Sequence, residues 1–330
     1  MKPLLAVRDL TTVFSLPGGL VARPVDGVSL DLFPGETLAL VGESGSGKTT
    51  LALSLLRLIP EPPGRIEPAS RVEFDGTDIL RLDPAALRRV RGGAIAMVFQ
   101  EPGSSLNPVM TVGSQIVETV RIHTGLDHGA ARRRAGALLA DVGLSDADRR
   151  LRQYPHELSG GMQQRVMIAM ALAGGPRVLI ADEPTTALDV TIQLQILDLL
   201  AGLKQRLGLA VLLITHDLSV AARVADRVAV MYAGRIVESA PAARLFDRPR
   251  HPYTEALLQA VPRVDRTGKR LPVIPGQPPP ATDWPADCRF HPRCRHTWER
   301  CREAEPGLLG TDGEQVVRCW LMNEPGRRAP

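Results

Sequence analysis

The chain has 330 residues, of which 44% are hydrophobic, and it carries 40 Lys and Arg against 36 Asp and Glu, a net charge of +4. This length and composition suit a globular protein with two compact domains, or one large domain with an appendage. The surplus of positive charge is too small to indicate a nucleic-acid partner. No run of about 18 apolar residues occurs, and the amino terminus lacks the pattern of a cleaved leader, so we expect neither a membrane span nor export.

The amino-terminal segment predicts a small antiparallel sheet. Apolar and polar residues alternate in Leu5 to Phe14 and in Val28 to Leu32, and the turn-forming Pro17 to Gly19 lies between them. Alternation with a period of two is typical of strands that are half exposed.

A glycine-rich motif follows the short apolar run Leu38 to Val41, which has the length of a buried strand. It matches G-x-x-x-x-G-K-[ST] in full and precedes a predicted helix that starts near Lys48. In such a loop, backbone N–H groups surround a phosphate chain, the lysine adds positive charge, and the final hydroxyl can bind Mg²⁺. The predicted ligand is a nucleoside triphosphate. The residues of the motif are Gly42, Glu43, Ser44, Gly45, Ser46, Gly47, Lys48 and Thr49.

The middle of the chain, from about 101 to 157, carries helical patterns such as Ala130 to Val142 and predicts an inserted helical subdomain. It is followed by Leu158 to Met162, in which Ser159 is a candidate N-cap of an amphipathic helix beginning at Gln163. The two glycines after Ser159 leave N–H groups accessible at the helix start, which is a second candidate anion site.

Two acids end the apolar run Val178 to Ala181. Carboxylates are tolerated at the carboxyl edge of a buried parallel sheet, where ligands of such sheets bind. Because side chains alternate along a strand, we expect Asp182 to reach Mg²⁺ and Glu183 to polarise the attacking water. This pair therefore predicts hydrolysis of the triphosphate.

A helix and a strand follow. Apolar residues recur every three or four positions from Ile192 to Leu207, and Gly208 is the expected helix stop. Ala210 to Ile214 reads as another buried strand, and His216 lies directly after it. The alternation of strands and helices over residues 1–240 predicts an α/β domain with a mostly parallel sheet.

The last 90 residues differ in composition, since 14 of the 28 prolines lie at or after Pro241. All four cysteines lie here, with the spacing C-x5-C-x6-C-x17-C. In a reducing compartment they indicate one local ligand site rather than disulfides, and four thiolates suit either a tetrahedral zinc or an iron–sulfur cluster. Such a site would replace a hydrophobic core in a proline-rich tail. The cysteines are Cys288, Cys294, Cys301 and Cys319.

The set of motifs resembles the ATP-binding subunit of ABC transporters. Ser159, Gly160 and Gly161 match the signature motif of that family, although Met162 replaces its usual final glutamine. Other positions match its Q-loop (Gln100), D-loop (Ala187, Leu188 and Asp189), switch histidine (His216) and adenine-stacking aromatic (Phe14).

The resemblance implies a RecA-like P-loop NTPase fold and a role for each matching residue. Glu183, His216 and Gln100 would act in catalysis, and Thr49, Gln100 and Asp182 would hold Mg²⁺. ATP would bind Phe14, residues 42–49 and Thr50, together with Ser159, Gly160, Gly161 and Asp189.

The tail narrows the resemblance to the oligopeptide and dipeptide importer subfamily. Arg250 to Thr254, Ile274 to Pro279 and the cysteines resemble the carboxyl-terminal extension of these subunits, which predicts a second domain over residues 241–330. For the cysteines the subfamily favours [4Fe-4S], while zinc and unligated thiols stay open.

The implied assembly lies on the cytoplasmic face of the plasma membrane. It contains a second ATPase subunit, identical or different, whose triphosphate would meet Ser159 and Gly161. It also contains two permeases, reached through the helical subdomain, and an extracytoplasmic substrate-binding protein. The expected function is ATP-driven import of di- and oligopeptides, with nickel or another small solute as the alternative. A non-transport ABC ATPase is disfavoured by the single motif set, and a non-hydrolysing regulator by Glu183 with His216.

Overall fold

The computed structural model describes residues 1–186, 188–261, 273–311 and 314–327. The chain divides into two compact units, each built from several segments. The first unit comprises Met1–Leu4, Leu32–Glu36 and Thr77–Ile214, and the second comprises Leu5–Asp31, Thr37–Gly76 and Thr215–Pro330. The predicted division into domains 1–240 and 241–330 stays a prediction.

The first unit contains three parallel strands with β8 in the middle. β8 (Val178–Asp182) pairs with β7 (Ile95–Val98) on one side and with β9 (Ala210–Thr215) on the other. Every residue of β8 and β9 is buried, as expected for strands covered on both faces. The predicted strands at 178–181 and 210–214 are confirmed.

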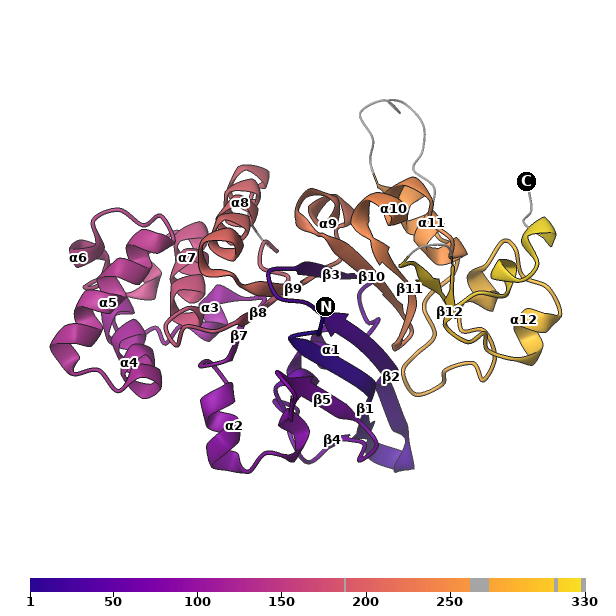
Figure 1. Ribbon diagram of the computed structural model, residues 1–330, viewed down its shortest axis with the longest axis horizontal. Helices are drawn as coiled ribbons and strands as arrows, with labels where there is room; N and C mark the ends of the chain where they lie inside the picture. The colour runs from indigo at the N-terminus through magenta and orange to yellow at the C-terminus, as the bar shows by residue number, and fades with distance from the viewer. Residues whose placement is uncertain (187, 262–272, 312–313, 328–330) are drawn as a thin grey trace. The chain divides into compact units, whose positions relative to one another are not determined.

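The helical part of the first unit gathers around α7 (Gly160–Ala171). Helices α3 (Pro102–Ser105), α4 (Val112–Thr124) and α5 (His128–Asp141) contact it, and α6 (Ala147–Arg150) packs on α5 (Figure 1). Two of these helices, α4 and α5, begin where a side chain caps them. Thr111 accepts a hydrogen bond from the Ser114 N–H in α4, and Asp127 accepts one from the Ala130 N–H in α5. Helices therefore fill the predicted 101–157 segment.

Helix α8 (Val190–Leu207) also belongs to the first unit. Asp189 caps its first turn, and Gly208 ends it with a φ of 65°, which favours glycine. Its apolar stripe buries Ile196, Leu200 and Leu203, so the periodicity correctly predicted this helix.

The second unit opens with a sheet in which β1 (Leu5–Ser15) is central. β1 pairs antiparallel with β4 (Gly64–Ile66) and β5 (Arg71–Phe74), and β2 (Val21–Leu32) is its other neighbour. β2 begins well before the predicted Val28. Pro24 and Gly27 break the alternating pattern there, yet the Gly27 N–H still finds the Thr11 hydroxyl at 2.9 Å.

A second group of strands in this unit joins the tail to the preceding chain. β3 (Thr37–Val41) pairs parallel with β10 (Arg227–Tyr232), and β10 pairs antiparallel with β11 (Arg235–Pro241). The tail adds β13 (Val316–Val317) to β11, and β12 (Leu309–Gly310) to β13. The proline-rich tail thus extends a sheet instead of forming one of its own.

The remaining helices and strands are short. Among the described residues, no helix has the length and apolar content needed to cross a membrane. The short elements of the first unit include β6 (Thr77–Asp78) and α2 (Pro84–Val90). Those of the second unit include α1 (Lys48–Leu55), α9 (Leu218–Val224), α10 (Ala242–Asp247), α11 (Pro252–Ala260) and α12 (Arg300–Glu303).

Candidate functional site

The phosphate-binding loop connects β3 to α1, as the motif requires. Lys48 is buried, and its Nζ donates hydrogen bonds to the carbonyl oxygens of Gly42 at 2.8 Å and Glu43 at 2.9 Å. Ser44, Gly45 and Thr49 are exposed, whereas Ser46 is buried and Thr50 is half-buried. Two carbonyl groups of the loop therefore bind the lysine of the same loop, and Thr49 stays exposed at the first turn of α1.

Two glycines of this loop are required by the strands beside it. A Cβ at Gly42 would lie 2.2 Å from the carbonyl oxygen of Met231 in β10. A Cβ at Gly47 would lie 1.9 Å from the carbonyl oxygen of Pro24 in β2, and Gly47 has a φ of +104°. Backbone this close leaves no room for a side chain.

The candidate catalytic carboxylates lie at the carboxyl end of β8 in the first unit. Asp182 is 1% exposed, and the half-buried Glu183 follows it with a positive φ of 46°. Positive φ is costly for a residue other than glycine and persists where the surrounding structure imposes it. Here the Glu183 N–H donates to the Ile214 carbonyl of the neighbouring strand at 2.9 Å.

Two donors hold the Glu183 side chain. Gln100 donates from Nε2 to Glu183 Oε2 at 3.1 Å, and Thr186 donates from Oγ1 to the same oxygen at 2.9 Å. The structure thus brings the predicted residues Gln100 and Glu183 together and adds Thr186, which the sequence analysis did not single out.

The second candidate anion site lies at the start of α7, where the structure corrects the prediction. The helix begins at Gly160 rather than at Gln163, and Ser159 takes the N-cap position. Ser159 is therefore the N-cap residue, as predicted, but among the described residues its hydroxyl makes no capping hydrogen bond. Both Ser159 and Gly160 are exposed.

The first turn of α8 and Leu188 just before it lie against Gly160 and Gly161. A Cβ at Gly161 would lie 2.7 Å from Ile192 Cγ2, and one at Gly160 would lie 3.7 Å from Leu188 Cδ2. Asp189 Oδ1 accepts the Ile192 N–H at 2.9 Å. The first residue of the predicted D-loop, Ala187, lies outside the described residues.

Two further predicted residues lie in the second unit. Phe14, in β1, is half-buried opposite Gly64, where a Cβ would lie 2.9 Å from the ring. His216 is exposed between β9 and Asp217, the N-cap of α9. The second unit also holds the phosphate-binding loop, whereas Asp182, Glu183, Gln100, Ser159 and Asp189 belong to the first. The roles of all these residues stay predictions.

Comparison with known proteins decides the family. The ABC transporter model matches residues 25–186, and the model "Oligopeptide/dipeptide transporter, C-terminal region" matches residues 237–301. A protein of Brucella abortus (strain 2308), named among peptide import ATP-binding proteins, is 50% identical over 317 residues, which cover 96% of this chain and 94% of the relative. Another of Brucella melitensis biotype 1, named likewise, is 48% identical over 333 residues and 98% of each chain.

The chain belongs to the ABC transporter family.

Solved structures agree with this membership. The dimeric, post-hydrolysis structure of the ATP-binding cassette MJ0796 with ADP and Pi aligns with a TM-score of 0.64 at 29% identity, over 72% of this chain and 98% of that one. The protein cbiO1 from Clostridium perfringens, part of an ABC transporter complex, aligns with a TM-score of 0.64 at 26% identity, over 75% and 92%. The predicted P-loop NTPase fold and ATPase activity are thus confirmed, and an ABC ATPase implies ATP and Mg²⁺.

The four cysteines of this ABC ATPase gather in the second unit without disulfides among the described residues. The Cys288 N–H donates to the Cys301 carbonyl at 3.2 Å. Burial raises the pKa of the Cys288 thiol to about 12, and the nearby Cys301, Cys319 and Cys294 add to this shift. Within the described part of the chain, no three His, Cys, Asp or Glu side chains are arranged to hold a single metal ion. The described residues therefore give no support to a bound zinc or to the expected [4Fe-4S] cluster, which stays a prediction.

Sequence reasoning missed two residues of the tail that contact the phosphate-binding loop. Tyr253 and Arg293 bind Glu43 across 210 and 250 residues of sequence. Both lie in or beside the segments that carried the subfamily resemblance, so the motif Arg250 to Thr254 was the signal available.

Proposed function

We propose that this chain is the ATP-hydrolysing subunit that energises import of di- and oligopeptides through a membrane ABC transporter. The observation that carries the proposal is the likeness along 96% of the chain to a peptide import ATP-binding protein, with an oligopeptide/dipeptide transporter region at 237–301. The tail supports the peptide assignment, because residues 237–301 match the oligopeptide/dipeptide transporter model and lie outside the residues 25–186 that the general ABC transporter model matches.

Hydrolysis is assigned to the residues that match the family motifs. Lys48 and the N–H groups of its loop would bind the phosphates, while Thr49 and Asp182 would hold Mg²⁺. Glu183 would polarise the attacking water, because Gln100 and Thr186 orient its carboxylate. His216 and Phe14 would contact the γ-phosphate and the adenine, as in the family.

The catalytic site is completed by a second ATPase subunit, identical or different. Ser159 is exposed at the N-cap of α7 with its hydroxyl free of the capping bond, and Gly160 beside it is exposed too. A helix start with accessible N–H groups favours an anion, and we assign this surface to the triphosphate of the partner subunit. Asp189 would lie at the same contact.

Two permeases would bind the helices between residues 101 and 157, and an extracytoplasmic protein would deliver the peptide to them. The chain itself would then lie on the cytoplasmic face of the membrane. Closure of the two ATPase subunits on ATP, and opening after hydrolysis, would shift the permeases between two conformations.

The four cysteines are assigned to a [4Fe-4S] cluster. Their nearness supports this, since the Cys288 N–H donates to the Cys301 carbonyl and the pKa of Cys288 responds to Cys301, Cys319 and Cys294. The cluster would cross-link the proline-rich tail. Protein purified without air should be brown with absorbance near 400 nm and should lose this colour in Cys301→Ser. Colourless wild-type protein with one zinc would contradict the assignment.

The test of the transport function uses the complete assembly. The chain should co-purify from its native membrane with two permeases, and reconstituted vesicles should hydrolyse ATP faster when the binding protein carries a peptide. Accumulation of labelled peptide, abolished by Lys48→Ala, would support import. Stimulation by a nickel complex or another solute, but by no peptide, would contradict the peptide assignment. Association with ribosomes or DNA, without permeases, would contradict transport.

A further inference from the structure

The carboxyl-terminal tail binds one residue of the phosphate-binding loop at two points. The Glu43 N–H donates to the Tyr253 hydroxyl at 2.9 Å, and Arg293 donates from its guanidinium to Glu43 Oε2 at 3.0 Å. The Glu43 carbonyl accepts from Lys48 of the same loop. The backbone N–H and carbonyl of Glu43 and one of its carboxylate oxygens are thereby held, and the contacts to the N–H and to the carboxylate come from residues more than 200 positions away.

A rigid aromatic cluster supports both contacts. Tyr253 is fully buried, with its ring 4.6 Å from Tyr232 and 5.3 Å from Phe290 between centroids. The Arg293 side chain is 5% exposed, and its guanidinium also lies near the Tyr232 ring. Buried rings in mutual contact have few alternative rotamers, so they hold the hydroxyl and the guanidinium in place.

The charge of Glu43 makes this contact relevant to the ligand. A carboxylate in a loop that binds a triphosphate repels that ligand unless a cation neutralises it. The Glu43 side chain is 25% exposed, and among the described residues its Oε1 lacks a hydrogen-bond partner. Arg293 thus carries the neutralising charge at this carboxylate, and it reaches the loop from the tail.

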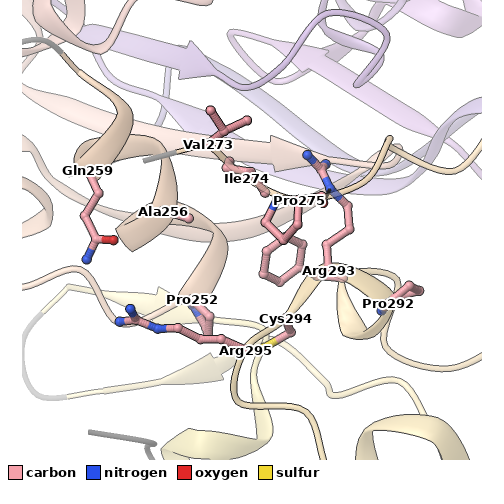
Figure 2. A pocket seen from close by; sticks show the side chains of 11 residues that line it. Pro252, Ala256, Gln259, Val273, Ile274, Pro275, Pro292, Arg293, Cys294 and Arg295 are labelled. Atoms are coloured by element: carbon pink, nitrogen blue, oxygen red, sulfur yellow. Dashed lines mark hydrogen bonds between the residues drawn. The ribbon is translucent and has the colours of Figure 1, made fainter. Parts of the chain in front are cut away.

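Arg293 stands directly before Cys294. Figure 2 shows the Arg293 side chain extending away from Cys294 along a cavity of about 360 Å³, which Pro252, Val273 and Ile274 also line. Cys288 and Cys294 pack against the aromatic cluster that contains Tyr232, Tyr253 and Phe290. The tail therefore connects the cysteine region to the phosphate-binding loop through packed side chains.

We propose that Arg293 and Tyr253 are positioning residues for ATP: they neutralise and hold Glu43, so the tail sets the affinity of the phosphate-binding loop for the triphosphate. The proposal rests on the proposed function, because it assumes that the loop binds ATP. It adds a role for the tail in nucleotide binding, beyond the assignment to peptide import.

Binding of the non-hydrolysable analogue adenylyl imidodiphosphate with Mg²⁺ to the full chain tests the proposal by calorimetry. We expect Arg293→Gln to raise the Kd about tenfold at low salt, and less at 0.5 M salt, because screening weakens repulsion by the partly exposed carboxylate. The double variant Glu43→Gln/Arg293→Gln should return the Kd to within about twofold of wild type, since it removes the repelling charge. Tyr253→Phe should raise the Kd about threefold by releasing the Glu43 N–H.

The matched control is Arg295→Gln. Arg295 lies two residues further on and pairs with Glu255 at 2.6 Å on the surface, so its loss should leave the Kd unchanged. In the assembled transporter, Arg293→Gln should raise the KM for ATP and leave kcat within about twofold.

Wild-type affinity in both Arg293→Gln and Tyr253→Phe, with normal circular dichroism, would overturn the proposal. If Arg293→Gln does not fold, unchanged affinity in Tyr253→Phe is by itself enough to overturn the proposal. Lys48→Ala separates this proposal from the proposed function. Loss of binding in Lys48→Ala while Arg293→Gln binds normally removes only the role of the tail, whereas normal binding in Lys48→Ala removes ATP binding by the loop itself.

Discussion

Gln100 donates a hydrogen bond from Nε2 to Glu183 Oε2 at 3.1 Å, although 83 residues of sequence separate them. Gln100 follows β7 and Glu183 follows β8, and these strands are parallel neighbours. Because parallel neighbours end at the same edge of a sheet, the two side chains meet there. A change in the loop at Gln100 would therefore reach the carboxylate directly.

Replacing Glu183 with glutamine should remove the general base and keep the shape of the side chain. We expect ATP binding within about twofold of wild type and a fall in kcat of about 10² to 10⁴, because general-base assistance contributes that much. Phosphate release and nucleotide binding should be measured on the same preparation. Turnover close to wild type would exclude Glu183 from this role.

Gly47 and Gly45 give a matched pair in one loop. Both have positive φ, but a Cβ at Gly47 would clash with the Pro24 carbonyl while a Cβ at Gly45 would meet no atom within 4 Å. We expect Gly47→Ala to cost about 3 kcal/mol of unfolding free energy and to abolish ATP binding, and Gly45→Ala to cost about 1 kcal/mol. Urea unfolding measures both; equal costs would contradict the steric explanation.

Tyr253→Phe should also lower stability. The variant keeps the ring in the aromatic cluster but leaves the Glu43 N–H without its acceptor. An unsatisfied buried donor costs about 1 to 3 kcal/mol. Thermal unfolding of the full chain should show this loss, and an unchanged midpoint would mean that water replaces the hydroxyl.

The burial of His251 predicts that the protein loses stability in acid. It is buried beside Arg318, Glu238 and Phe290, and its Nδ1 accepts the Tyr253 N–H at 3.0 Å. Burial lowers its pKa from 6.5 to about 3. The folded protein therefore excludes a proton that the unfolded chain binds below 6.5, and the stabilisation present above that pH is lost as the pH falls towards 3.

From pH 7 to pH 5 this residue should cost about 2 kcal/mol. In His251→Asn the side chain can still cap the helix, so the unfolding free energy should decline less over the same range. Equal pH dependence of the two proteins would show that His251 does not carry the effect.

Much of the nucleotide-binding part could be predicted from sequence, because its signals are local. The buried runs before Gly42 and Asp182 gave strands, and the spacing of the loop motif gave its position between strand and helix. The start of α7 was misplaced by three residues, since two glycines are poor helix formers and packing against Ile192 overrides that preference.

The contacts of the tail with the loop could not be predicted in the same way. No periodicity or motif spacing relates Glu43 to Tyr253 or Arg293, because the pairing depends on how the tail packs against β10 and the aromatic cluster. The family motifs predicted that Gln100 and Glu183 act in the same site, but they did not predict the contact of Thr186 with Glu183.

Turnover is proposed to require pairing of two subunits, since Ser159 of one subunit is assigned to the triphosphate bound by another. The direct measurement is the ATPase rate per chain against protein concentration and added partner subunit, with the oligomeric state followed by sedimentation. We predict a rate that rises with assembly and is lost in Ser159→Arg while ATP binding persists. Full and constant turnover by a chain that sediments as a monomer would contradict the account.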